Sequence, residues 1–307
     1  MNKKNLLVTG GFGFIGKSFI KRYFKFYKNI FILDNLQFSK IDNELLNIKN
    51  TFFFKGDIRD RKIFAKIPNV NYILHLASPS SIILFNKNPN ECIDITINGF
   101  IKVLNFAKEK KIEKLIYPSS GSVYGKNDHP FNESIVFPQP INIYGKTKLA
   151  CEYIARIYSE YFPIIGLRIF AGFGPEEDHK KDFASVIYIF IKKAFNNKVI
   201  EIFGDGNQTR DFVYIDDITE AINKLFELNF VGILNIGSGR SIVFKEIISL
   251  IKNYFKNLEV KYISKPTNYL IHTNADITLY KKLFKKVPHD PKNGIIELIK
   301  ILRSNIT

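Results

Sequence analysis

A tyrosine and a lysine stand four residues apart where a helical segment begins. Tyr144 and Lys148 belong to YGKTK, and the following LACEYIARIYSEYF has the apolar and aromatic spacing of one helix face. Residues with this spacing are neighbours on a helix, so the pair can be an acid/base held beside a cation. It can also be two stacked side chains without chemistry, and the rest of the chain must decide between these interpretations.

A glycine-rich turn follows the first apolar run. TGGFGFIG places Gly10, Gly13 and Gly16 in a GxxGxxG pattern directly before a helix predicted over about 14–27. Glycine permits a tight turn, lets backbone N–H groups approach a diphosphate, and lets the helix N-terminus face that charge. Asp34 ends the run FILD about 20 residues on, where a carboxylate can accept both ribose hydroxyls. A purely structural strand-to-helix turn is the alternative.

Asp34, the acid at the end of the second apolar run, also bears on the choice between NAD and NADP. Asn35 follows Asp34 and no arginine stands beside them, which favours NAD over NADP. Asp57, in GDIRD after the third run, can meet the adenine edge or simply occupy a turn at the strand end. The further candidates for binding the cofactor are Phe14, Ile15, Ile58, Leu76, Ala77 and Phe170.

These residues need elements that bring them to one edge of a sheet. Short apolar runs alternate with helical patterns from NLLVTG to PIIGLRIF. Hydrophobic strands divided by amphipathic helices are typical of a parallel sheet covered on both faces. The sequence therefore predicts an α/β, Rossmann-type doubly wound sheet with a smaller α/β region at its C-terminal end. We assign residues 1–170, together with 205–237, to a dinucleotide-binding domain, and 171–307 mainly to an interleaved substrate-binding region.

Composition narrows the class of protein. The 307 residues are 46% hydrophobic, enough for a substantial core, and carry a net charge of +16 with lysines spread from Lys3 to Lys300. Because no long basic block with interleaved aromatics occurs, we expect anionic small ligands and no nucleic-acid partner.

Cys92 and Cys151 fit a reducing compartment and show no metal-ligand spacing. No apolar run approaches the roughly 20 residues of a membrane helix, so we expect a soluble, cytoplasmic protein without a membrane partner.

Eight motifs follow one another along most of the chain. In order they are TGGFGFIG, DNL, GDIRD, HLAS, SSGSVYG, YGKTK, GFGP and GDGNQTRDFVYIDD. With them the chain resembles the extended short-chain dehydrogenases and, among these, the NAD-dependent nucleotide-sugar epimerase/dehydratase family. The resemblance implies bound NAD, a UDP-sugar substrate, and a homodimer joined through the helices at 96–109 and 146–160. The implied reaction is 4-epimerisation of a UDP-hexose or its N-acetyl analogue through transient oxidation at C4.

The resemblance also implies catalytic roles. Tyr144 would be the acid/base at the sugar 4-hydroxyl, and Lys148 would bind the nicotinamide ribose. By its charge Lys148 would lower the pKa of Tyr144 from the ordinary value of about 10. Ser120 occupies the family's third catalytic position and would hydrogen-bond the same sugar oxygen, with Ser119 and Ser122 as competing choices.

At two positions the chain lacks carboxylates that related enzymes carry, which argues against a dehydratase or a decarboxylase reaction. Dehydratases of this kind carry an Asp-Glu pair where this chain has Gly121 and Ser122, and related decarboxylases carry a glutamate at the position of Ser122. Without these carboxylates, oxidation and re-reduction at C4 is favoured. A nucleotide-sugar 4,6-dehydratase or 4-keto-sugar reductase stays as the enzymatic alternative. An NAD-binding regulatory protein is the non-enzymatic one, although the combination of Ser120, Tyr144 and Lys148 argues against it.

The second half of the chain supplies substrate contacts. Arg210 lies where the family binds the nucleotide diphosphate, and its forked donors suit two phosphates. A surface ion pair with Asp211 or Asp205 is the alternative. Ala171 stands where the family usually has an asparagine that helps to hold the phosphate, and Lys-Pro-Thr-Asn at 265–268 replaces Arg-Pro-Gly-Asp.

The choice of sugar depends on one late position. If Asp276 matches the family's late aspartate, Thr273 stands where some epimerases carry a bulky tyrosine that excludes an N-acetyl group at C2. The hypothesis is that the pocket admits N-acetylhexosamines as well as hexoses. An unrelated loop threonine is the alternative.

Overall fold

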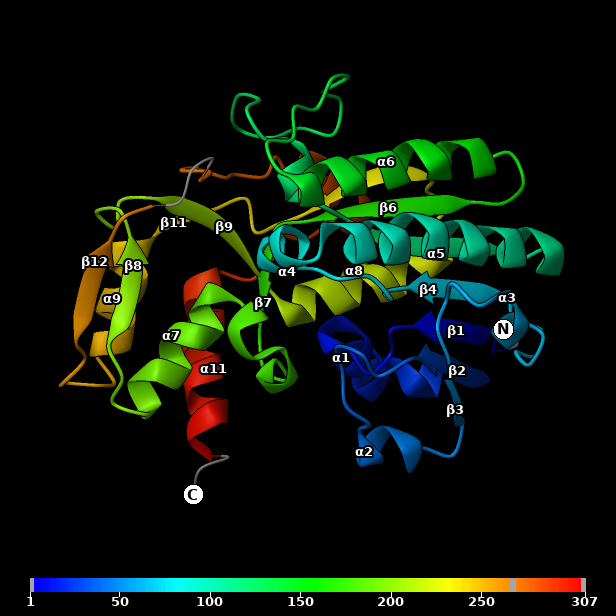
Figure 1. Cartoon of the computed structure of the whole chain (residues 1–307), viewed down its shortest axis with the longest axis horizontal. Coiled ribbons are helices and arrows are strands. Elements are labelled where there is room, and N and C mark those ends of the chain that lie inside the picture. The colour runs from blue at the N-terminus through cyan, green and yellow to red at the C-terminus, as the bar shows by residue number, and fades with distance from the viewer. Residues whose placement is uncertain (1–2, 266–268, 305–307) are drawn as a thin grey trace.

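Seven apolar strands form one parallel sheet (Figure 1). The computed structural model describes residues 3–265 and 269–304, and the strands follow the order β10-β6-β5-β4-β1-β2-β3. This order grows outward from β1 in both directions, so the predicted Rossmann-type, doubly wound fold is confirmed. The strands are β1 (Asn5–Thr9), β2 (Asn29–Asp34), β3 (Thr51–Lys55), β4 (Tyr72–His75), β5 (Lys114–Ser120), β6 (Ile164–Ile169) and β10 (Gly232–Ile236).

Helices cover both faces of the sheet because the strands are apolar on both. Within β1, Leu7 packs into one hydrophobic core, while Leu6 and Val8 pack into the other, as the two-residue period of a strand requires. The Leu7 side is covered by α5 (Pro89–Lys110) and α6 (Ile143–Tyr158), and the opposite side by α1 (Phe14–Tyr23) and α8 (Ile215–Glu227). The helix predicted over about 14–27 ends as an α-helix at Tyr23 and continues as the 3-10 turn Phe24–Phe26.

A smaller region lies at the carboxyl ends of the large sheet (Figure 1). It contains a three-stranded sheet in the order β11-β9-β7 and the parallel pair β12-β8. Between these elements the chain returns to the large sheet, where β10 pairs with β6. The division into two domains stays a prediction. The elements of the smaller region are β7 (Ala171–Phe173), α7 (Val186–Phe195), β8 (Ile200–Phe203), β9 (Thr209–Tyr214), β11 (Ser241–Val243), α9 (Phe244–Lys252), β12 (Val260–Ile263) and α11 (Pro291–Ser304). The helix α10 (Thr278–Phe284) instead packs on β10 of the large sheet.

Short helices complete the connections. They are α2 (Asn43–Leu46), α3 (Arg61–Phe64) and α4 (Ile82–Lys87), with 3-10 turns over Gly121–Val123 and Asp178–Phe183. Within residues 3–265 and 269–304, no helix is both long enough and apolar enough to cross a membrane.

Candidate active site

The turn between β1 and α1 has no room for side chains. Gly10 has a φ of +67°, and a Cβ there would lie 2.7 Å from the backbone nitrogen of Ala77 and 2.8 Å from the carbonyl carbon of Leu76. A Cβ at Gly16 would lie 2.7 Å from the Cα of Gly11. Only bare backbone therefore faces the space at the strand ends, and this cradle fits the diphosphate of NAD.

The first turn of α1 is open to an anion. Gly13 is the N-cap, and among the described residues no side chain caps the helix. Phe14 and Ile15 follow, and the first turn contains no acid. The nitrogen of Lys180 lies 4.5 Å from the centre of the Phe14 ring and pairs with Glu177 at 2.9 Å. The unsatisfied N–H groups and the helix dipole both favour a phosphate here.

Asp34 is held in place by donors from its own chain. Its carboxylate accepts hydrogen bonds from the backbone N–H of Phe12 at 3.1 Å and of Leu36 at 2.9 Å, and from the Ser39 hydroxyl at 2.8 Å. A carboxylate has about four lone-pair sites, so Asp34 is oriented and one site stays available to a ribose hydroxyl. Ser39 was not predicted, because its contact with Asp34 depends on the path of the loop after β2.

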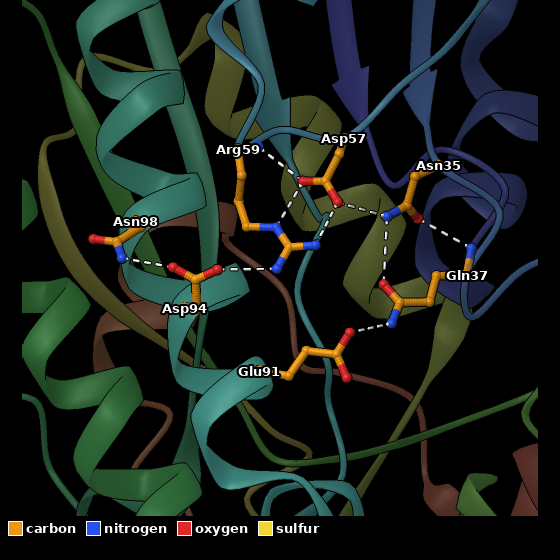
Figure 2. A network of polar contacts seen from close by, with 7 residues as sticks. All are labelled: Asn35, Gln37, Asp57, Arg59, Glu91, Asp94 and Asn98. Carbon is orange, nitrogen blue, oxygen red and sulfur yellow. Dashed lines mark hydrogen bonds and ion pairs between the residues drawn. The ribbon is translucent and has the colours of Figure 1, made fainter.

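Asp57 belongs to a wider polar network (Figure 2). The Arg59 guanidinium donates to both carboxylate oxygens, at 3.0 and 2.7 Å, and Asn35 donates to one of them at 3.1 Å. Arg59 is the main cause that holds the pKa of Asp57 below its ordinary value. Ile58 is buried between these residues and packs against Gly99 of α5, where a Cβ would come within 2.4 Å of it. The sequence analysis did not single out Arg59.

The predicted catalytic residues Ser120, Tyr144 and Lys148 lie together. Tyr144 is the second residue of α6, and the N-cap Asn142 fixes this helix start by accepting the Gly145 N–H at 2.8 Å. The Ser120 side chain, at the end of β5, acts on the Tyr144 phenol by lowering its pKa. The nitrogen of Lys148 lies 5.9 Å from the centre of the Tyr144 ring, one turn along the helix.

The predicted effect of Lys148 on Tyr144 is wrong for the protein alone. Burial of the phenol raises the pKa of Tyr144, and the opposing contribution comes from the hydrogen bond with Ser120. Lys148 is itself buried, which lowers its pKa from 10.5 to about 8. Its ammonium group donates to the Ser78 hydroxyl at 3.1 Å and to the Pro118 carbonyl at 3.2 Å.

Ser78 connects Lys148 to α5. The Ser78 and Thr96 hydroxyls lie 3.0 Å apart, and a small cavity lies beside them, lined also by Lys148 and Cys151. His75, at the end of β4, is buried and shares a 2.8 Å hydrogen bond with Thr9. It therefore has a packing role at this end of the sheet. The sequence signal for Ser78 was the hydroxyl at the end of HLAS, a strand end of the parallel sheet.

Ser119, one of the two alternatives to Ser120 as the catalytic serine, donates to a buried ion pair. The Ser119 hydroxyl donates to Glu152, and Arg168 donates to both carboxylate oxygens of Glu152, at 3.0 and 2.7 Å. Both charged side chains are almost fully buried. Ser120 instead accepts the Ser122 N–H at 3.1 Å and reaches Tyr144. Glu152 and Arg168 were not predicted, although an arginine within the apolar strand PIIGLRIF was a visible signal.

Arg210 lies in the smaller region, half-buried among carbonyl oxygens. Its guanidinium donates to the carbonyls of Thr209 at 2.8 Å, Ile271 at 3.0 Å and Leu270, and lies 5.0 Å from the Tyr269 ring. Burial lowers the pKa of Arg210. No acid pairs with it within residues 3–265 and 269–304.

The alternative of a surface ion pair is therefore wrong for both candidate acids. Asp211 is buried and accepts hydrogen bonds from the backbone N–H groups of Ser238, Gly239 and Ala275. Asp205 instead accepts from Asn207.

The other predicted substrate residues serve internal contacts. The Thr273 hydroxyl accepts the Asp211 N–H at 3.1 Å, so Thr273 lies beside Arg210 in the smaller region. The Asp276 carboxylate accepts from Asn132 at 2.6 Å and from the Thr278 N–H at 2.8 Å.

The residues after β6 lie near the catalytic serine. Phe170 packs with Tyr124 and Phe131 in the core, and its ring would lie 3.1 Å from a Cβ at Gly121, next to Ser120. Ala171 begins β7 and is half-buried. Pro266 to Asn268 of the late motif lie outside the described residues.

This site geometry agrees with a known family. A model described as "NAD dependent epimerase/dehydratase family" matches residues 6–237. The chain belongs to this family. Its cofactor is therefore NAD.

Individual relatives cover almost the whole chain. A UDP-glucuronate 4-epimerase of Thermodesulfobacterium geofontis is 30% identical, over 92% of this chain and 90% of that protein. A UDP-N-acetylglucosamine 4-epimerase of Methanobrevibacter ruminantium M1, solved with UDP-N-acetylmuramic acid, is 30% identical with a TM-score of 0.91, covering 99% and 100% of the two chains. A UDP-glucose 4-epimerase of Thermotoga maritima, solved with UDP-glucose, is 27% identical with a TM-score of 0.92, covering 99% and 100%. The chain is thus a nucleotide-sugar epimerase-family protein with UDP-sugar epimerases as neighbours.

Proposed function

We propose that the protein is an NAD-dependent 4-epimerase of UDP-hexoses or their N-acetyl analogues. The observation that carries the proposal is the cluster of Ser120, Tyr144 and Lys148 at the sheet edge next to the glycine cradle. The turn after Ser120 supports it, because Gly121 and Ser122 supply no carboxylate for the elimination of water. The 4-epimerases among the structural neighbours are consistent with the same chemistry.

Three side chains would have separate roles in the reaction. Bound NAD would supply the reversible oxidation and reduction of C4. The phenolate form of Tyr144 would take the proton of the 4-hydroxyl, becoming the neutral phenol, and would later return that proton, and Ser120 would hold that hydroxyl through a hydrogen bond. The 4-keto sugar must present its other face before reduction, so the diphosphate has to stay anchored while the sugar turns. Arg210 would provide this anchor.

Turnover without added cofactor tests the proposal. The purified protein is incubated with UDP-glucose and, separately, with UDP-N-acetylglucosamine, and the C4 epimers are measured by chromatography. We expect at least one epimer, since an epimerase regenerates its NAD in each cycle. A Tyr144→Phe variant is the control for contaminating activity. Absence of both epimers from protein that binds NAD would reject a UDP-sugar 4-epimerase.

The choice of sugar is a separate part of the proposal. We propose that Thr273 leaves space for an N-acetyl group, so both substrate classes turn over. A Thr273→Tyr variant should then lose turnover of UDP-N-acetylglucosamine while keeping that of UDP-glucose. Thr273→Ser keeps the hydroxyl that accepts the Asp211 N–H and is the matched control. Equal loss of both activities in Thr273→Tyr would reject this role.

We also propose a cytoplasmic homodimer joined through α5 and α6. The support is an apolar stripe on α6, where Tyr153, Ile157 and Tyr161 at its end are 56%, 66% and 53% exposed. An Ile157→Lys variant should shift the mass measured by light scattering from dimer to monomer. Val136→Lys, at an exposed apolar residue of a loop away from this helix, should not. An Ile157→Lys protein that stays dimeric would contradict this interface.

A further inference from the structure

We propose that Arg59 is a positioning residue for the adenosine end of NAD. It would hold the Asp57 carboxylate and, with Asp94, fasten the strand-end loops around the adenosine to α5. Tight retention of NAD would therefore depend on Arg59. The inference uses the family's NAD binding and is independent of which sugar reaction the protein performs.

The first line of contacts passes through the guanidinium of Arg59. Two of its nitrogens donate to the two oxygens of Asp57, at 3.0 and 2.7 Å, and a third donates to Asp94 on α5 at 2.9 Å. The Arg59 backbone N–H also donates to Asp57 at 2.8 Å. Asp94 is fixed in turn by Asn98, one turn along α5, at 2.6 Å. The planar fork of arginine thus sets the orientation of Asp57 relative to the helix.

A second line of contacts joins the loop after β2 to the same helix (Figure 2). The Asn35 amide donates to Asp57 at 3.1 Å, and its carbonyl accepts the Gln37 N–H at 3.0 Å. The Gln37 amide then donates to Glu91 of α5 at 2.7 Å. The loops after β2 and after β3, which flank the place of the adenosine, are therefore both tied to the first turns of α5.

The other side of the same helical segment supports the catalytic residues. Cys92 packs in a small apolar cluster with Tyr144 and Phe85. Thr96 shares a hydrogen bond with Ser78, which accepts from Lys148. One rigid helix therefore relates the adenosine loops to the acid/base pair, so a dinucleotide would be held at both of its ends against a common support.

A second arginine on the same segment shows what an ordinary surface pair looks like. Arg61 also reaches α5, but it makes a single contact with Glu109 at 3.0 Å, and the two side chains are 79% and 58% exposed. Arg59 is 32% exposed and makes three side-chain contacts with two acids. Exposed single pairs contribute little, so Arg61 is a matched control for charge and for contact with α5.

NAD binding to purified protein tests the assignment. Arg59→Met keeps most of the side-chain length and removes the donors. We expect the dissociation constant for NAD to rise about 10-fold or more, and bound NAD to leave faster on dialysis. Asp94→Asn should give a smaller rise, since Arg59 still holds Asp57 there. Arg61→Met should bind NAD as the unaltered protein does.

ADP-ribose separates positioning from general destabilisation. It keeps the adenosine and diphosphate but lacks nicotinamide, so its affinity for Arg59→Met should fall by the same factor as that of NAD. The unfolding temperature of the unliganded variant should match that of Arg61→Met. Unchanged affinity for NAD and ADP-ribose in Arg59→Met would overturn the proposal, and so would an equal loss in Arg61→Met. Failure of sugar epimerisation alone would leave these binding results unaffected and would bear only on the proposed function.

Discussion

The two nucleotide-binding ends of the site handle charge in opposite ways. At the cofactor end, Asp34 and Asp57 already accept hydrogen bonds from their own chain, and Arg59 partly neutralises the acids around it. At the proposed sugar-nucleotide end, Arg210 is half-buried with carbonyl oxygens as its acceptors. A carbonyl dipole satisfies an N–H donor but does not cancel a full charge.

The contrast suggests two modes of binding. Groups that are already oriented lose little freedom when a ligand arrives, so the cofactor end suits a resident molecule. A half-buried cation without an acid gains most when an anion comes, so the other end suits a diphosphate that binds and leaves in each cycle. The following changes test this contrast, beginning with the largest expected effect.

The proposed acid/base Tyr144, which lies between the two ends, should be essential for turnover but not for NAD binding. Tyr144→Phe removes the acid/base oxygen, and we expect the epimerisation rate to fall by about 10³-fold. The affinity for NAD should stay within about 2-fold, because the cofactor end lies on other elements. Tyr153→Phe, on an exposed tyrosine of the same helix, is the control. A Tyr144→Phe enzyme with a tenth of normal activity would contradict the acid/base role.

Removing Arg210 should affect the substrate end alone. For Arg210→Met we expect KM for the UDP-sugar to rise about 10²-fold, as for the loss of a buried charge-assisted contact. NAD binding should not change. Arg240→Met, which removes an exposed pair with Asp290, should leave KM unaltered. Steady-state kinetics and NAD titration measure both effects, and a parallel loss of NAD would mean that the two ends are not separate.

The buried pair under Ser119 should matter for stability. Glu152→Gln leaves Arg168 buried without its acid, so we expect the free energy of unfolding to fall by about 3 kcal/mol. The surface pair of Lys4 and Glu113 is the comparison, and Glu113→Gln should cost less than about 1 kcal/mol. Urea unfolding measures both. Similar small losses would show that burial does not strengthen this pair.

The burial of Lys148 predicts a pH dependence of stability. Its pKa is lowered from 10.5 to about 8 in the folded chain. Between these values the unfolded chain binds more protons, so the free energy of unfolding should rise with pH, by up to about 1.4 kcal/mol per pH unit. Lys148→Met should lack this contribution. Urea unfolding without ligand at pH 8 and pH 9.5 compares the two proteins, and identical pH profiles would contradict the shifted pKa.

The fold and the local motifs could be predicted because short-range rules determine them. The apolar runs require a sheet buried on both faces, and Gly10 and Gly16 are required where backbone meets backbone. Tyr144 and Lys148 were singled out by their spacing on a helix, and the resemblance to a family implied their catalytic roles. These signals lie within single segments, so one sequence is enough to read them.

The missed residues depend on contacts between distant segments. Arg59 meets Asp94 and Arg168 meets Glu152 only after the helices have packed on the sheet. The choice between Ser119 and Ser120 could not be made from the sequence, because both are small polar residues at one strand end. The structure engages Ser119 with Glu152, which supports Ser120 as the residue beside Tyr144. The error about the pKa of Tyr144 has the same origin, since burial is a tertiary property.

The carbonyl surroundings of Arg210 have a consequence for inhibitor design. A compound that replaces the diphosphate by a neutral, non-accepting linker would cover the guanidinium without compensating its charge. Such a compound should bind poorly even if its uridine and sugar parts fit. Linkers that carry a negative charge, such as phosphonate or sulfonate groups, would keep that compensation. At the cofactor end, a negatively charged group added at the ribose would weaken binding, because the acids there would repel it.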